Sequence, residues 1–162
     1  MSQLDIRTGF KLRRLTEHLQ QALPDAVLRK MEAWMEDITV QISPEDRGNG
    51  YNLGHVRYTA VFSFEGFPFR KTDPASVMAN VAVWLCDNDP SRDECDLDDP
   101  TFDVEPESED TAIMTFELEF SETMMLLPDD NGDVLWNERR WSLAPYDIWI
   151  AEEAEILEKD DA

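Results

Sequence analysis

The sequence is short of the residue types on which most catalytic and metal sites depend. It contains two cysteines and two histidines in 162 residues. Cys86 and Cys95 have no second pair and no nearby histidine, so they do not match a zinc site, and so few cysteines are typical of a reduced cytoplasm. His18 and His55 lie in no recognisable serine or cysteine nucleophile motif. We therefore expect no catalytic residue, no bound metal and no cofactor.

Long apolar runs and phosphate-binding glycine loops are also missing. No apolar run approaches the ~20 residues that a membrane-spanning helix needs, and the polar N-terminus has none of the features of a secretory signal. The acidic stretches at 87–99 and 129–133 lack the ligand spacing of a calcium loop. We expect neither membrane insertion nor a nucleotide-phosphate site.

Positive charge is scarce, because 14 lysines and arginines face 36 aspartates and glutamates and the net charge is −22. Such a surface repels nucleic-acid phosphates and anionic lipids, so we expect DNA to be at most in transit and not bound. The acidity is compatible with solubility, mimicry of nucleic acid, a basic partner or the lining of a DNA passage. Lys11, Arg13 and Arg14 are the densest basic cluster. We expect them on a solvated helix face, with contact to an acidic partner as the alternative.

Two helices are predicted by local patterns. Leucines three and four residues apart, beginning at Leu12, predict an amphipathic helix that ends at Pro24. Asp73 is a good N-cap and Pro74 suits the first helical position, so a second helix is expected to begin there and to end before Pro90. Both helices would lay an apolar face on a sheet.

Strands are predicted where apolar and polar residues alternate. The clearest alternations cover 58–64 and 112–120, and a short strand is expected at 102–104. Glu117 and Glu119 fall on the outward face of the second alternation, where we expect them to be solvated.

Two neighbouring segments are harder to assign. Residues 27–42 fit both a helical and an alternating spacing, and we interpret them as extended, with a hairpin broken near Glu36 and Asp37 as one arrangement. Residues 43–54 are punctuated by proline and glycine, which predicts a loop.

The order of helix, strands, helix and strands predicts an α+β fold with a mixed or antiparallel sheet and helices packed on one face. The length favours a single domain over 1–150, followed by an acidic, frayed tail at 151–162. The expected core anchors are aromatic residues: Phe62, Phe64, Trp84, Phe116 and Phe120.

The C-terminal part is rich in large aromatic side chains. The Asn131–Gly132 pair favours a tight hairpin turn, after which 134–150 is expected to return as a strand and run along the body. Core packing would explain the aromatics there, but such residues are also common in subunit contacts. The candidate interface residues are Trp136, Arg139, Arg140, Trp141, Tyr146 and Trp149.

Four stretches of the sequence carry a family resemblance. They are "LRRLTEHLQQALP", "YTAVFSFEGFP", "ANVAVWLCDNDP", and "IMTFELEFSE" together with "PYDIWI", and they span Leu12 to Ile150. In this order and spacing they resemble the R-type tail completion proteins of temperate contractile-tailed phages, which also occur in phage-tail-like bacteriocins. The stretches 43–54 and 91–100 match no part of that pattern.

The resemblance implies a tail-terminator-like α+β protein that caps the head-proximal end of a finished tail. It implies a ring, of six subunits by family analogy, that stops growth of tube and sheath. The implied partners are further copies of the chain, the tail tube and sheath proteins, and a head-side connector or collar. The protein would be present in the bacterial cytoplasm during assembly and then in the virion or tail-like particle. The alternatives are an acidic, DNA-mimicking inhibitor of a basic protein and an enzyme that uses scattered carboxylates.

Overall fold

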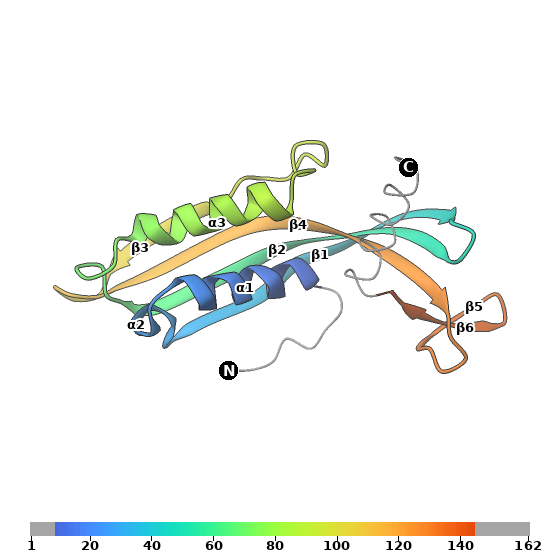
Figure 1. Cartoon of the computed structure of the whole chain (residues 1–162), viewed down its shortest axis with the longest axis horizontal. Helices are drawn as coiled ribbons and strands as arrows, with labels where there is room; N and C mark the ends of the chain where they lie inside the picture. Colours follow the sequence, from blue (N-terminus) through green and yellow to red (C-terminus); the bar gives the residue numbers. More distant parts are fainter. Residues whose placement is uncertain (1–8, 145–162) are drawn as a thin grey trace, which may run out of the picture. The chain divides into compact units, whose positions relative to one another are not determined.

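The computed structural model describes residues 9–144, which form three helices and a six-stranded sheet (Figure 1). The helices are α1 (Phe10–Ala22), α2 (Asp25–Leu28) and α3 (Pro74–Asn88). The strands are β1 (Met31–Asp46), β2 (Tyr51–Phe67), β3 (Thr101–Pro106), β4 (Ala112–Pro128), β5 (Val134–Trp136) and β6 (Arg139–Leu143). The strand order is β1-β2-β4-β6-β5, and β3 also pairs with β4. The sheet is antiparallel, which confirms the predicted α+β class.

The described chain divides into two compact units. Unit 1 contains residues 9–10, 40–56 and 122–144, and unit 2 contains residues 11–39 and 57–121. The three long strands, β1, β2 and β4, contribute residues to both units. The expectation of a single domain over 1–150 stays a prediction, and the tail at 151–162 lies outside the described residues.

The core of unit 2 lies between one face of the sheet and the two long helices. Leu12 of α1 donates its backbone N–H to the Tyr58 hydroxyl at 3.2 Å, and the Trp84 ring of α3 lies 6.0 Å from the Phe120 ring. Because Tyr58 and Phe120 also contact each other, with ring centroids 5.8 Å apart, both helices cover the same face. Each fully buried aromatic side chain there contributes about 1.5–3 kcal/mol of transfer free energy. The five expected anchors are all buried: Phe62, Phe64, Trp84, Phe116 and Phe120.

Helix α3 has the boundaries that its sequence predicts. The Asp73 carboxylate accepts the backbone N–H of Ala75 at 2.9 Å, and Pro74 occupies the first turn, where no N–H is needed. At the C-terminal end the Asp89 N–H donates a hydrogen bond to the Leu85 carbonyl at 2.9 Å. The two ends hold the helix so that its apolar side faces the sheet.

Strand β1 corrects two predictions. It runs without a hairpin from Met31 to Asp46, although a positive φ of 51° at Asp37 breaks its alternation. The predicted loop at 43–54 is instead a short turn between β1 and β2. In this turn the Arg47 N–H donates to the Gly50 carbonyl at 2.8 Å. Gly54 is part of strand β2, and no side chain fits there because a Cβ would lie 1.9 Å from the Gln41 carbonyl oxygen of β1. Glycine here allows two strands to approach closely and does not mark a loop.

The hairpin of unit 1 also differs from expectation. A return strand after residue 133 is present, but the tight two-residue turn is Asn137–Glu138, where both φ values are positive, 52° and 58°. The predicted Asn131–Gly132 pair lies in a different turn, between β4 and β5, where the Gly132 N–H donates to the Asp129 carbonyl at 2.9 Å. Strand β4 therefore pairs with β6, and β5 pairs only with β6.

Candidate interaction surfaces

The first candidate surface is the aromatic hairpin, by which we mean strands β5 and β6 with Trp136 and Trp141. The Trp141 indole is buried and donates Nε1–H to the Trp136 carbonyl at 2.9 Å. The ring of Tyr51 packs edge-on against both, with centroids 4.7 Å from Trp136 and 5.6 Å from Trp141. Trp141 therefore acts as a core residue of unit 1, and Trp136 remains half-buried.

The two arginines of the hairpin are exposed. The Arg139 guanidinium lies 5.1 Å from the centroid of the Trp141 ring, within the range of a cation–π interaction. Arg140 forms no ion pair with any residue in 9–144, and its cross-strand partner is Leu135, which is 64% exposed. Structure thus brings four of the six predicted interface residues into one hairpin. The other two, Tyr146 and Trp149, lie outside the described residues.

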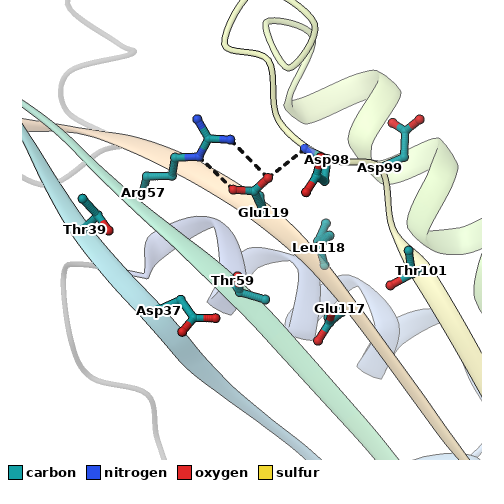
Figure 2. Close-up of a pocket in the computed structure, with 10 residues that line it drawn as sticks. All are labelled: Asp37, Thr39, Arg57, Thr59, Asp98, Asp99, Thr101, Glu117, Leu118 and Glu119. Carbon is teal, nitrogen blue, oxygen red and sulfur yellow. Dashed lines mark hydrogen bonds and ion pairs between the residues drawn. The ribbon is translucent and has the colours of Figure 1, made fainter.

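The second candidate surface is the outward face of unit 2, which is the sheet face opposite α1 and α3. It carries a cavity of about 340 Å³, which we call the acidic cavity. Five carboxylates line it against one guanidinium (Figure 2). The lining residues come from β1, β2, β3 with the segment before it, and β4: Asp37, Thr39, Arg57, Thr59, Asp98, Asp99, Thr101, Glu117, Leu118 and Glu119.

One ion pair organises the acidic cavity. Arg57 donates Nε–H to Glu119 Oε2 at 2.8 Å and Nη2–H to Oε1 at 3.1 Å, so the pair joins β2 to β4 (Figure 2). The Asp98 N–H adds a third bond to Glu119 Oε1 at 3.0 Å. The bonds from Arg57 lower the pKa of Glu119 to about 2. The pKa of the Asp98 carboxyl is raised by hydrogen bonding of that carboxyl to the Glu119 side chain and by the negative charge of Glu119. The expectation that Glu119 is merely solvated is therefore wrong.

A buried charge cluster contacts the backbone of two residues of the acidic cavity, Asp98 and Glu119. Asp89, at the end of α3, accepts Lys11 Nζ at 2.7 Å on Oδ1 and Arg92 Nη1 at 3.0 Å on Oδ2. All three side chains are less than 10% exposed. Lys11 was expected on a solvated helix face, and this placement corrects that prediction.

Lys11 and Arg92 also donate hydrogen bonds to backbone carbonyls of β4. Strand β3 pairs with β4 only over 112–117. Beyond that range Arg92 donates to the Glu119 carbonyl at 2.7 Å and Lys11 donates to the Ser121 carbonyl at 2.9 Å. Side chains thus satisfy carbonyls that have no strand partner at this edge. Because Arg92 also donates to the Asp98 carbonyl at 2.6 Å, it holds the segment that carries Asp98 against the sheet.

The other candidate residues do not converge on a reactive site. His18 lies in α1 and His55 in β2, and the free thiols of Cys86 and Cys95 are exposed. Within residues 9–144 no three His, Cys, Asp or Glu side chains are grouped in a way that could hold a metal ion. None of the helices described there has the length and apolarity of a membrane span.

Sequence reasoning missed the acidic cavity because carboxylates are abundant along the whole chain. Its members Asp37, Asp99 and Glu117 come from three separate segments, and only strand pairing brings them together. A usable signal was present in the opposite charges of Arg57 and Glu119 on the outward faces of two predicted strands. That signal becomes informative once the two strands are known to be neighbours.

Comparisons with known proteins extend this picture. Residues 9–145 match the family described as P2 phage tail completion protein R (GpR). The chain is also 30% identical over 146 residues to a protein of Haemophilus phage HP1 (strain HP1c1), described as an uncharacterized 19.2 kDa protein in the rep-hol intergenic region. That alignment covers 88% of this chain and 87% of the phage protein. No solved structure matches the chain.

The family match covers all of the described residues, including both candidate surfaces. It agrees with the family resemblance carried by the four sequence stretches. The chain belongs to the P2 phage tail completion protein R (GpR) family and hence to the proteins of phage tail assembly.

Proposed function

We propose that the chain caps the head-proximal end of a contractile tail. In this role it forms a ring of identical copies, six by family analogy, that stops growth of the tube and the sheath. The ring then offers a docking surface to the head-side connector or collar. The observation that carries the proposal is the match of residues 9–145 to a tail completion family.

The charge and exposure of the two surfaces support a ring. A closed ring of identical subunits needs two different patches on each subunit that meet head to tail. The aromatic hairpin is exposed at Leu135 and carries two arginines, whereas the acidic cavity has five carboxylates against one guanidinium. The surfaces are chemically different and opposite in charge, as such a contact requires.

The negative charge of the chain fits a passage for DNA. B-DNA carries about one negative charge per 1.7 Å of helix axis, so a channel with a net negative wall holds it weakly. The net charge of −22 would then assist passage of the genome through the ring, without binding it. In this proposal the protein assembles in the bacterial cytoplasm and remains in the finished particle.

The first test is the oligomeric state of the purified protein. Light scattering over a range of concentrations measures its mass, and negative-stain images of the same peak show whether a central hole exists. The expected result is a closed ring with a hole, formed by the protein alone or on added tail tubes. A strict monomer that also fails to join tail-tube preparations would contradict the role.

A further inference from the structure

We propose that the hairpin arginines Arg139 and Arg140 of one copy dock into the acidic cavity of the next copy. The proposal rests on the ring of the proposed function and names the contact between its subunits. The partner copy completes the site, because the cavity holds unpaired carboxylates and the hairpin supplies cations.

The hairpin has the chemistry of a donor. Arg139 and Arg140 are adjacent and exposed, and Arg140 has no ion-pair partner among residues 9–144. Beside Arg140 stands the exposed side chain of Leu135, and Trp136 is half-buried on the same hairpin. Arginine together with aromatic and apolar side chains is the composition found at the centre of protein interfaces. The outer edge of β5 has no strand partner in the described part of the chain.

The acidic cavity has the chemistry of an acceptor. Asp37, Asp99 and Glu117 are exposed, and within residues 9–144 none of them has a hydrogen-bond or ion-pair partner for its side chain. The cavity's own cation, Arg57, is already engaged by Glu119 at 2.8 Å. A guanidinium from outside would therefore meet free carboxylates, to which it can bind in a bidentate manner. The cavity volume of about 340 Å³ leaves room for such a side chain.

Charge favours this head-to-tail contact over a symmetric contact between two acidic cavities and over docking of another pair of cations. Two acidic cavities facing each other would repel, so a symmetric contact through this surface is disfavoured. Among the other adjacent cations, Arg14 pairs with Glu17 and Arg70 with Asp110. Arg29 and Lys30 belong to unit 2, the unit that carries the cavity, and no exposed large apolar residue neighbours them in the chain.

Charge reversal on each surface tests the proposal. Arg139→Glu with Arg140→Glu alters the donor, and Asp99→Lys with Glu117→Lys alters the acceptor; all four side chains are exposed, so folding should be kept. Asp93→Lys with Glu94→Lys is the matched control, because it makes the same charge change on exposed carboxylates outside the cavity. Sedimentation at low salt measures self-association, and circular dichroism checks the fold of each variant.

The proposal predicts a specific pattern of masses. Each reversal alone should weaken self-association by about 10- to 100-fold, as the loss of interfacial ion pairs does, while the control behaves as wild type. A mixture of the two reversed proteins should associate again with the two chains in alternation, because the intact hairpin of one fits the intact cavity of the other and the two reversed surfaces also attract each other. A chain carrying both reversals should associate again, since its surfaces are complementary in the opposite sense.

Three outcomes would overturn the proposal. One is a wild-type chain that stays monomeric at low salt, and another is a donor or acceptor variant that associates as well as the control. The third is disruption by Arg29→Glu with Lys30→Glu while the hairpin variant keeps its mass. In the last two cases a ring with a central hole would still leave the proposed function standing, so the two failures can be distinguished.

Discussion

Replacing Asp89 by asparagine should be among the most damaging changes on the chain. The Asp89 side chain is 1% exposed and lies between Lys11 and Arg92, which are 8% and 9% exposed. Asparagine keeps the shape of the side chain and removes its charge, so two buried cations lose their common counter-ion. Breaking a buried ion pair by removing one partner costs about 3–5 kcal/mol.

This loss is large relative to the total free energy of unfolding. Domains are stable by about 5–15 kcal/mol, so the substitution would remove about a fifth of the largest such value and about 30–50% of a mid-range one. For a chain of this length each kcal/mol lowers Tm by about 2–4 °C, so Asp89→Asn should lower it by about 6–20 °C. Urea unfolding gives the free energy, and a thermal scan gives Tm.

Asp87→Asn is the matched control, because Asp87 is an exposed carboxylate of the same helix. It should change the free energy of unfolding by no more than about 0.5 kcal/mol. A double-mutant cycle with Lys11→Met isolates the contribution of the 2.7 Å pair from that of Arg92. If Asp89→Asn unfolds within about 1 kcal/mol of wild type, the account of a charge cluster that holds α1, α3 and β4 together is refuted.

Three further predictions concern other parts of the structure. Glu119→Gln should lower the free energy of unfolding by about 1–2 kcal/mol at neutral pH; this figure allows for solvent screening of the partly exposed pair with Arg57. Because the folded pKa of Glu119 is about 2 and its ordinary value is 4.5, this stabilisation is complete above pH 4.5 and disappears as the pH falls towards 2. Urea unfolding of both proteins at several pH values measures the difference, and a difference that does not shrink in acid would contradict the assignment. Gly54→Ala should cost more than about 2 kcal/mol, since its Cβ would lie 1.9 Å from the Gln41 carbonyl and φ is +133°; an unchanged Tm would argue against that close approach. Trp84→Ala should lower the free energy of unfolding by about 3–5 kcal/mol, because it opens a cavity beside Phe120. Urea unfolding measures this loss, and a loss under about 1 kcal/mol would contradict the packing of α3 on Phe120.

Local signals explain why much of the fold could be predicted from the sequence. The Asp73–Pro74 start of α3 and the alternation that places Phe116 and Phe120 on one face of β4 both depend on residues close in the chain. Such signals act through capping and side-chain periodicity, which need no knowledge of the partner elements.

The errors arose where distant residues decide the structure. Lys11 looks like a surface residue until Asp89 and the Ser121 carbonyl are placed beside it. Gly54 looks like a loop residue until β1 lies against it. The acidic cavity depends on strand pairing in the same way, so its carboxylates could not be distinguished from the many others in an acidic sequence.

The most direct test of the central claim is the position and effect of the protein on finished tails. Particles produced with the chain present and labelled should be imaged by electron microscopy beside particles produced without it. The account predicts label at the head-proximal end, tails of uniform length, and irregular tube and sheath lengths with unjoined heads when the chain is missing. Tails of normal length that join heads without it, or label along the sheath or at the distal end, would contradict the account.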